Sequence, residues 1–270
     1  MVAHRIIFVS QEISPYLTAS DNGKVGRDLP QAMQARKYEV RTFMPDYGDI
    51  NERRNQLHEV IRLSGMSIVI GESDHPLVVK VASMHPSRIQ VYFIDNDDYF
   101  QKLDSDIDVF GSDRADNDER IIFYARGTVD TAKKLRWEPD LIHVSGWVSA
   151  LVPLYVKRLY GPSFQHSKVV YCVQPEDDIA PVDPAIFAKL GEEGVEAADV
   201  EKFAGMPVDK LLLHHIGVEY SDGVVFRGVE PDPALTARCE ARGIPYIVVS
   251  ADADLAEELH NFYQSLIESK

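Results

Sequence analysis

Cysteine is scarce in this chain, which has Cys172 and Cys239 as its only two among 270 residues. Two cysteines cannot build a disulfide framework, so we expect reduced thiols and a cytoplasmic protein. The N-terminus lacks the apolar segment and the small-residue cleavage site of a signal peptide. No apolar run approaches the roughly 18 residues that a membrane-spanning helix needs. The sequence therefore predicts no membrane partner.

Positive charge is also in short supply, because 28 Lys and Arg stand against 43 Asp and Glu, for a net charge of −15. Such a balance repels phosphate backbones and anionic lipid headgroups, which argues against nucleic-acid or membrane-surface binding. Hydrophobic residues make up 45% of the chain and charged residues 26%. That composition excludes a disordered chain and is enough to bury a large core.

Several motifs of cofactor and metal chemistry are missing. The loop after the first apolar run contains Gly23 but neither G-x-G-x-x-G nor a P-loop, so a capped turn is the simpler interpretation of it. No H-x-x-x-H, C-x-x-C or H-E-x-x-H spacing occurs, and His214 and His215 are neighbours that face different directions on a helix. There is no G-x-S-x-G elbow either. We therefore expect no cofactor and no metal site.

Short apolar runs alternate with amphipathic stretches along most of the chain. The runs are at 5–9, 39–43, 90–94, 141–144, 169–173, 223–226 and 244–249. Helical patterns lie at 25–36, 118–135, 147–159, 208–220, 233–242 and 254–268. This alternation predicts an α/β fold with a doubly wound, mostly parallel, Rossmann-like sheet. Runs at 66–70 and 77–82, on either side of a polar turn and followed by 89–94, predict a small antiparallel excursion.

Ligands of such sheets bind beyond the carboxyl ends of the strands. His143 and Trp147 stand at one of these ends. His143 is either an acid/base or sugar-binding group or a structural histidine, and Trp147 either stacks on a sugar or packs on the sheet. The segment 174–184 is acidic and rich in proline, which predicts a long surface loop.

Two acidic runs, at 95–98 and 116–119, carry oxygen ligands but do not meet the EF-hand pattern. Asp and Asn beside an aromatic residue suit sugar hydroxyls. The alternative is helix capping, by Asp95 or Asn96 for a helix at 97–102 and by Asp116 for the helix at 118–135.

In chain order, five segments resemble the N-terminal half of bacterial glycogen synthases and plant starch synthases, the family-5 glycosyltransferases. They are RIIFVSQEISPY, RDLPQAMQARKYEVRTFMPDYGDI, VYFIDNDDYF, DNDERIIFYARG and KKLRWEPDLIHVSGWVSALVPLYVK. The resemblance covers residues 4–175 and, more loosely, 205–226. It implies one half of a GT-B arrangement of two Rossmann-like domains. In that family the N-terminal domain mainly holds the acceptor glucan, and the second domain supplies most contacts to ADP-glucose or UDP-glucose.

By the same resemblance, the glucan-binding candidates are Glu12, Tyr99, Asp116, Asn117, His143 and Trp147. The chain also departs from the family at the chemistry. The family's donor loop Lys-Thr-Gly-Gly-Leu is here the segment 18–22, which contains Thr18, Ser20 and Asp21. Ser145 stands where the family has its catalytic histidine, and Gln174-Pro175 replaces a His-Asn pair. We therefore expect no intact catalytic residue, and the loss of a cation disfavours a nucleotide sugar.

Two functions follow, and the sequence leaves open whether the chain is an enzyme. One is transfer of glucose from a nucleotide sugar to an α-1,4-glucan, with a separate donor-binding chain or a homo-oligomer. The other is a non-catalytic module that binds an α-glucan, an oligosaccharide or a protein, which the departures favour. We expect residues 1–270 to form a single domain without the donor-binding domain. The apolar stripe of 254–268 is expected to pack back on this domain, with a dimer contact as the alternative.

Overall fold

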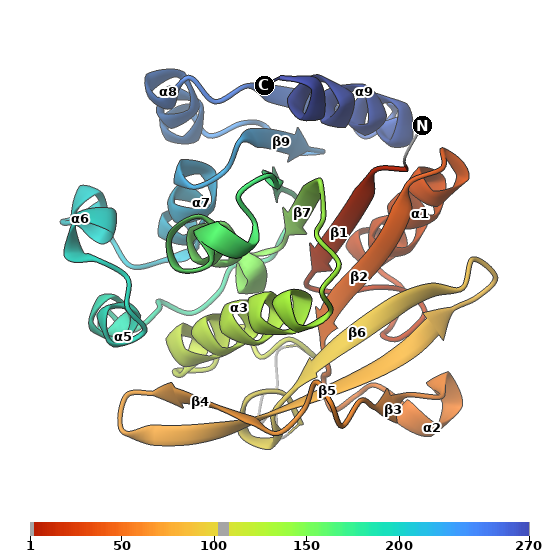
Figure 1. The fold of residues 1–270 in the computed structure, drawn as a ribbon. Coiled ribbons are helices and arrows are strands. Elements are labelled where there is room, and N and C mark those ends of the chain that lie inside the picture. The colour runs from red at the N-terminus through yellow and green to blue at the C-terminus, as the bar shows by residue number, and fades with distance from the viewer. Residues whose placement is uncertain (1–2, 102–107, 270) are drawn as a thin grey trace.

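A computed structural model describes residues 3–101 and 108–269 of the chain. Within these residues one ten-stranded sheet runs through the molecule in the order β10-β9-β8-β7-β1-β2-β6-β5-β3, with β4 paired to β5 (Figure 1). The strands are β1 (Arg5–Ser10), β2 (Glu39–Pro45), β3 (His58–Glu59), β4 (Met66–Ile70), β5 (Ser73–Met84), β6 (Ile89–Asp95), β7 (Leu141–Ser145), β8 (Lys168–Val173), β9 (Gly223–Arg227) and β10 (Tyr246–Val249). The α-helices are α1 (Asp21–Ala35), α2 (Glu52–Asn55), α3 (Asn117–Lys134), α4 (Val152–Leu154), α5 (Ile186–Glu192), α6 (Ala197–Val200), α7 (Lys210–Glu219), α8 (Pro233–Arg242) and α9 (Leu255–Glu268).

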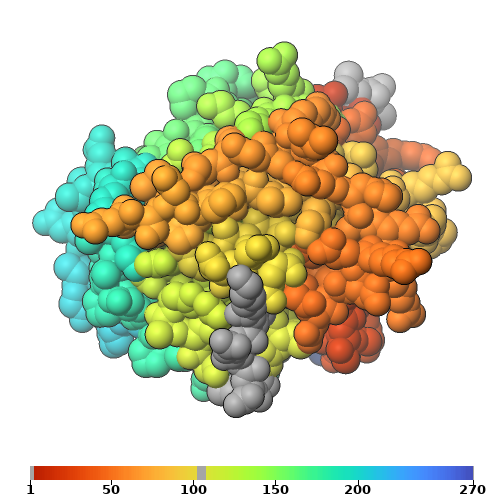
Figure 2. Space-filling view, turned by 90° about the horizontal axis from the view of Figure 1, so that it is seen from below, coloured from red at the N-terminus to blue at the C-terminus, as the bar shows by residue number. Residues whose placement is uncertain are grey.

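The predicted parallel sheet is confirmed. β1 pairs in parallel with β2 and β7, and parallel pairing continues from β7 to β10 on one side and from β2 to β6 on the other. The antiparallel excursion is also confirmed, in β4, β5 and β6. Its turn is shorter than expected: Gly71 has a φ of +59°, and Ser73 already pairs with Ile70. Figure 2 shows the orange residues of this hairpin extending across the surface toward the cyan segment.

Helices cover both faces of the sheet, because its strands are apolar on both sides. Ile6 and Phe8 of β1 point to the face covered by α1 and α9, whereas Ile7 and Val9 point to the face covered by α3, α4 and α7. The two cysteines divide in the same way. Cys172 belongs to the core beneath α9, and Cys239 of α8 belongs to the core of the opposite face.

The prediction that the last helix packs on its own domain is confirmed. Its inward residues Leu259, Phe262, Tyr263 and Leu266 are all buried in the core shared with β1 and α1. The apolar stripe that could have formed a dimer contact is therefore used within the chain. None of the helices in the described residues combines the length and the apolar content needed to cross a bilayer.

The prediction of one helix over 147–159 is wrong. The segment divides into a 3₁₀ turn η2 (Trp147–Ser149), α4 and a π-helical turn η3 (Tyr155–Leu159). Pro153 lacks an N–H to donate, and proline is tolerated only in the first turn of a helix, so the helix begins anew there. The predicted helix at 97–102 is a π-helical turn, η1 (Asp97–Gln101), and residue 102 lies outside the described residues. The short elements β3, α2, α5 and α6 were not predicted.

Candidate functional site

A cavity of about 930 Å³ lies at the carboxyl ends of β1, β7, β8, β9 and β10. β1 and β7 are neighbours in the sheet. The connection after β1 leads to β2 on one side, whereas the connection after β7 leads to β8 on the other side, so a crevice opens between the ends of β1 and β7. Its polar and aromatic lining includes Gln11, Glu12, Ser20, Asp21, Asn22, Lys24, Trp147, Gln174, Glu176, Lys210 and Arg227. The cavity is therefore where a doubly wound sheet is expected to bind a ligand.

The loop between β1 and α1 forms one wall. Ser20 is the N-cap of α1: its Oγ accepts the N–H of Gly23 at 2.8 Å, which confirms the capped turn, and donates to Glu12 Oε2 at 2.5 Å. Burial raises the pKa of Glu12 above its usual range, against the lowering effect of the Ser20 hydrogen bond. Asp21 is exposed and binds Lys24 Nζ at 2.9 Å. Thr18, the remaining candidate of this loop, is exposed and is not among the lining residues.

Gln11 lies against the turn that follows β7. Gly146 in this turn has a φ of +92°, and a Cβ on it would come within 2.7 Å of Gln11 Cβ. Only glycine tolerates both this positive φ and this close approach, so the backbone at Gly146 can pass directly over the Gln11 side chain. Gln11 is 6% exposed, and its Oε1 has no hydrogen-bond partner within residues 3–101 and 108–269.

The loop after β8 brings a carboxylate to the same wall. Glu176 Oε1 accepts the backbone N–H of Trp147 at 3.0 Å. Glu176 Oε2 lies 3.7 Å from His214 Nε2 and has no hydrogen-bond partner among the described residues. Burial raises the pKa of Glu176 to about 7. Trp147 itself is 1% exposed and belongs to the hydrophobic core, which agrees with a packing role rather than with stacking on a sugar.

Arg227 ends β9 and completes the wall. One of its terminal nitrogens donates to Asn22 Oδ1 and to Gln174 Oε1, the latter at 3.2 Å. Its Nε is buried, and no described residue forms a hydrogen bond with it. Three residues that line the cavity thus each have a buried polar atom without a hydrogen-bond partner in the part of the chain that the structure describes: Gln11 Oε1, Glu176 Oε2 and Arg227 Nε.

His143 is buried below the cavity floor. Its Nδ1 lies 2.9 Å from the hydroxyl of Tyr263 on α9, and its ring lies against Phe8. Burial, with a smaller contribution from Arg227, lowers its pKa to about 3, so the imidazole is neutral at physiological pH. Of the roles predicted for His143, the structure shows the structural one. Ser145 follows on the same strand and, with His143, borders a void of only about 10 Å³ beside the cavity.

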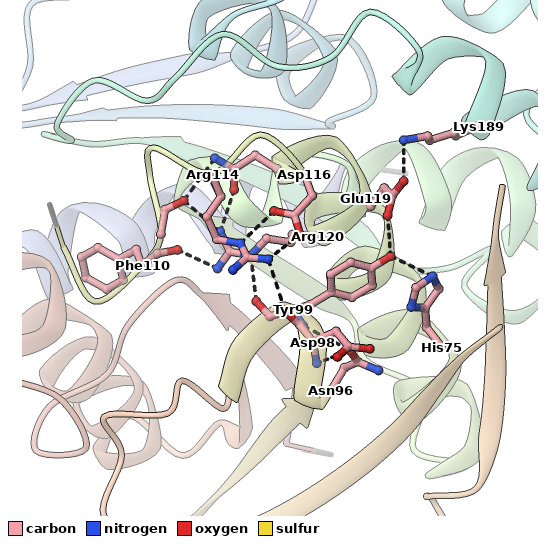
Figure 3. A network of polar contacts seen from close by, with 12 residues as sticks. His75, Asn96, Asp98, Tyr99, Phe110, Arg114, Asp116, Glu119, Arg120 and Lys189 are labelled. Atoms are coloured by element: carbon pink, nitrogen blue, oxygen red, sulfur yellow. Dashed lines mark hydrogen bonds and ion pairs between the residues drawn. The ribbon is translucent and has the colours of Figure 1, made fainter. Parts of the chain in front are cut away.

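Tyr99, Asp116 and Asn117 lie elsewhere, in the polar network of Figure 3. The Tyr99 hydroxyl donates to Glu119 Oε2 at 2.8 Å and lies 2.9 Å from His75 Nε2. Asn117 Nδ2 donates to the carbonyls of Gly111 and Ser112. These three residues are not among those that line the cavity, so the structure does not bring them together with Glu12 around one ligand.

Arg120, in the first turn of α3, lies at the centre of this network. It is fully buried and donates to the carbonyls of Tyr99, Phe110 and Gly111 and to Asn117 Oδ1, all at 2.6–3.1 Å (Figure 3). Burial lowers the pKa of the guanidinium to about 10, and it remains charged at neutral pH.

The capping interpretation of the two acidic runs holds for one of them. Asn96 Oδ1 accepts the N–H groups of Asp98 and Tyr99, as a cap does. Asp116 occupies the N-cap position of α3 without a side-chain hydrogen bond to the helix, because both of its oxygens accept from Arg114. Among the described residues, no group of three or more His, Cys, Asp and Glu side chains has the geometry of a metal site.

Sequence reasoning missed Gln11, Glu176 and Arg227. Gln11 and Glu176 follow strands whose carboxyl ends the sequence predicts correctly. Neither residue was a candidate, because the candidates at these ends were the residues that match the family pattern. Arg227 comes directly after the run 223–226, so the rule of looking beyond every strand end would have found it.

Comparison with known proteins gives a consistent match for the first two thirds of the chain. Residues 5–175 match the family model of the starch synthase catalytic domain. The glycogen synthase of Chlorobaculum parvum is 32% identical over 232 residues, and that of Chlorobaculum tepidum is 37% identical over 223 residues. Each match covers 81% of this chain and 44% of the relative, so the chain spans less than half the length of these relatives.

A solved structure has the same fold. The catalytic domain of starch synthase IV from Arabidopsis thaliana, bound to ADP and acarbose, superposes with a TM-score of 0.68 at 14% sequence identity. The superposition covers 92% of this chain and 52% of that one.

Proposed function

Because the chain belongs to the starch synthase catalytic domain family of glycogen and starch synthases, we propose that its cavity binds a neutral α-glucan and that the chain by itself transfers no glucose. The observation that carries the proposal is a set of buried polar atoms that belong to cavity-lining residues and have no hydrogen-bond partner among the described residues. Gln11 Oε1 and Glu176 Oε2 are acceptors, whereas Arg227 Nε is a donor. Leaving a buried polar group unpaired costs about 1–3 kcal/mol, so a ligand that pairs with these groups after small side-chain rotations is favoured.

A sugar hydroxyl pairs with groups of both kinds, because it donates one hydrogen bond and accepts others. The diphosphate of a nucleotide sugar only accepts. It would pair with Arg227 but would leave Gln11 Oε1 unpaired and would face the carboxylate of Glu176. The wall therefore favours a polyhydroxyl ligand over a phosphorylated one.

The cations of the cavity are already engaged. Lys24 binds Asp21, and Lys210 Nζ donates to the carbonyls of Glu176 and Asp177 and to Asp178. The guanidinium of Arg227 is shared between Asn22 and Gln174. Binding a diphosphate would require these contacts to be broken, which supports the preference for a neutral ligand.

The candidate residues for the reaction itself support the same proposal. Ser145 stands at the position where the resemblance puts the catalytic histidine, and a hydroxyl does not exchange protons near neutral pH as an imidazole does. His143, two residues earlier, is buried beneath α9 and has a pKa of about 3. Neither residue is suited to acid/base work in the cavity.

Glucosyl transfer is the second candidate function. It is favoured by the relatives, which are named glycogen synthases, and by the ADP and acarbose bound in the solved structure. On this chain it would require basic residues from a separate donor-binding chain or from a second copy.

Isothermal titration with maltoheptaose, ADP-glucose and UDP-glucose tests the proposal. We expect maltoheptaose to bind and both nucleotide sugars to give no heat beyond dilution. Arg227→Met should weaken maltoheptaose binding about tenfold. Arg5→Met is the matched control: Arg5 lies at the amino end of β1, away from the cavity, and its loss should leave binding unchanged.

Two outcomes would overturn the proposal. Tighter binding of ADP-glucose than of maltoheptaose, with incorporation of labelled glucose into glucan, would establish the second candidate. No heat from any of the three ligands would show that the cavity does not bind a glucan, and a protein partner would become the better explanation of the fold.

A further inference from the structure

The end of the sheet at β10 carries exposed apolar side chains. The large hydrophobic residues that are exposed in the described part of the chain are Ile61, Val69, Tyr246 and Val248. Two of them belong to β10, where Tyr246 is 36% and Val248 is 54% exposed. Because they are two residues apart, both side chains project from the same face of the strand, where the Tyr246 ring meets Phe226 at 5.8 Å. The helices that pack on the sheet therefore leave this strip of β10 uncovered.

The outer edge of β10 carries backbone groups without partners. On its inner edge β10 pairs with β9, and the Pro245 carbonyl there accepts the N–H of Val224 at 3.0 Å. Backbone groups alternate in direction along a strand, so the N–H and C=O groups of Tyr246 and Val248 point away from β9. Since β10 is the last strand at this end of the sheet, no strand in the described residues pairs with these four groups.

β10 also lacks the features that protect an edge strand from further pairing. Its four residues, YIVV, include no charge and no proline, and its register with β9 is continuous. The strand at the other end of the sheet, β3, is only two residues long and polar. β4 presents the exposed Val69, but Ser67 on the same face is bonded to Asp74 of β5. Of the edge strands described, β10 is therefore the best suited to accept another strand.

We propose that β10 pairs with β10 of a second copy of this chain, antiparallel about a two-fold axis at Ile247. In this register Tyr246 lies opposite Val248 of the second copy, and the two residues exchange both of their backbone hydrogen bonds. The axis repeats this exchange, so all four outward groups are paired. A register shifted by two residues would set half of these groups opposite residues outside β10.

The side chains fit the same register. Each exposed Tyr246 ring packs against the exposed Val248 of the other copy, and aromatic and β-branched side chains that face each other across two strands stabilise their pairing. The strip that solvent reaches in one copy is thereby covered by the same strip of the other. A two-fold interface requires this self-complementarity.

The charges at the two ends of β10 favour a second copy in this orientation. Arg242 lies five residues before Ile247, and its side chain is 52% exposed beside Glu219. Asp252 lies five residues after Ile247 and is exposed. Antiparallel pairing about Ile247 brings Arg242 of each copy toward Asp252 of the other, whereas parallel pairing would bring like charges together. The two ends of the strand are thus complementary to each other across the axis.

Sedimentation equilibrium of the whole chain measures the association, at about 0.15 M salt to screen the net charge of −15. We expect a mass of twice 30.4 kDa at micromolar concentrations. Val248→Lys puts positive charges into the apolar strip and should raise the dissociation constant of the dimer about a hundredfold. Val69→Lys is the matched control, because Val69 is 55% exposed on another edge strand, and it should leave the dimer unchanged.

Oxidative cross-linking tests the register. Ile247 faces its own counterpart in a non-hydrogen-bonded pair, whose Cα atoms lie about 4.5 Å apart, within the span of a disulfide. Ile247→Cys should therefore give a disulfide-linked dimer on mild oxidation. Val248→Cys should not, because its counterpart lies two positions farther along the ladder. The native Cys172 and Cys239 are buried and do not compete.

The outcomes decide the proposal without a glucan, so they do not depend on the proposed function. A monomeric mass at every concentration would overturn it and leave β10 for a segment of another protein. A dimer that survives Val248→Lys, or that Val69→Lys weakens equally, would also overturn it. If the Val248→Lys chain does not fold, the cysteine variants still decide, because cross-linking at position 248 as fast as at 247 contradicts the register.

Discussion

The polar network around Arg120 and the wall of the cavity are built from similar residues but differ in how they are satisfied. In the network, Arg120 donates to four acceptors and the Tyr99 hydroxyl has partners on two sides. In the cavity wall, three buried polar atoms remain without partners. A network that satisfies itself stabilises the fold, whereas under the proposed function the unpaired groups of the wall find their partners on a ligand.

This difference bears on residues that match a family pattern. Glu12 lies in the wall, whereas Tyr99 and Asn117 lie in the network. Both kinds of position are compatible with the same resemblance, because a family keeps its fold as well as its site. A match at Asn117 is therefore weaker support for glucan binding than the unmatched Glu176.

The most severe way to break the network is Arg120→Met. The change removes the Arg120 donor from the carbonyls of Tyr99 and Phe110 and from Asn117 Oδ1, and we expect it to lower the free energy of unfolding by about 4 kcal/mol or more. Urea unfolding followed by circular dichroism measures this. Arg114→Met, which removes the partly exposed pair with Asp116, is the matched control and should cost about 1 kcal/mol. Equal losses in the two variants would show that Arg120 is not the centre of the network.

His143 sharpens the comparison, because it is buried beside the cavity and its Nδ1 is paired with the Tyr263 hydroxyl. Its pKa is about 3 in the folded chain and about 6.5 in an unfolded one, so acid favours the unfolded state, which binds the proton. Relative to a His143→Leu/Tyr263→Phe double variant, the unchanged chain should lose about 1.4 kcal/mol of stability per pH unit as the pH falls from about 6.5 toward 3. Urea unfolding at pH 7, 6 and 5 checks this. His214 is present in both chains, so its own titration cancels. Parallel pH profiles would contradict the prediction.

Ser20 belongs to both kinds of region, because it caps α1 and also binds Glu12 in the cavity wall. Ser20→Ala should lower the free energy of unfolding by about 1 kcal/mol through loss of the cap. Thermal unfolding measures the change. Asn51→Ala, which removes the cap of the four-residue helix α2, is the control and should cost less, since few contacts depend on that helix. A larger loss from Asn51→Ala would contradict this ranking.

Sequence patterns predicted the sheet well, because buried parallel strands are continuous apolar runs that need no knowledge of their neighbours. The pattern gave the wrong structure at 147–159. The apolar residues there have helical spacing, but Pro153 divides the segment into separate short helical turns. The short helices between 186 and 200 carry too few periodic residues to be detected.

The candidate site was harder to predict. The loop with Glu12, Ser20 and Asp21 was found because it follows a strand. The burial of Tyr99 and Asn117 could not be foreseen, because their partners, His75 and Gly111 among them, come from other parts of the chain. Glu176 was missed for the same reason, since the helix that positions it begins 34 residues later along the chain, at Lys210.

The two buried thiols make the opening of each face of the sheet separately measurable. Burial raises the pKa of Cys172 to about 12 and that of Cys239 to about 11, so neither forms a reactive thiolate at neutral pH while covered. Cys172 lies in the core beneath α1 and α9, and Cys239 lies in the core of the opposite face, so we expect each thiol to react with an alkylating reagent only when its own face of the sheet opens. The two alkylation rates therefore report local unfolding separately for the two faces of the same sheet.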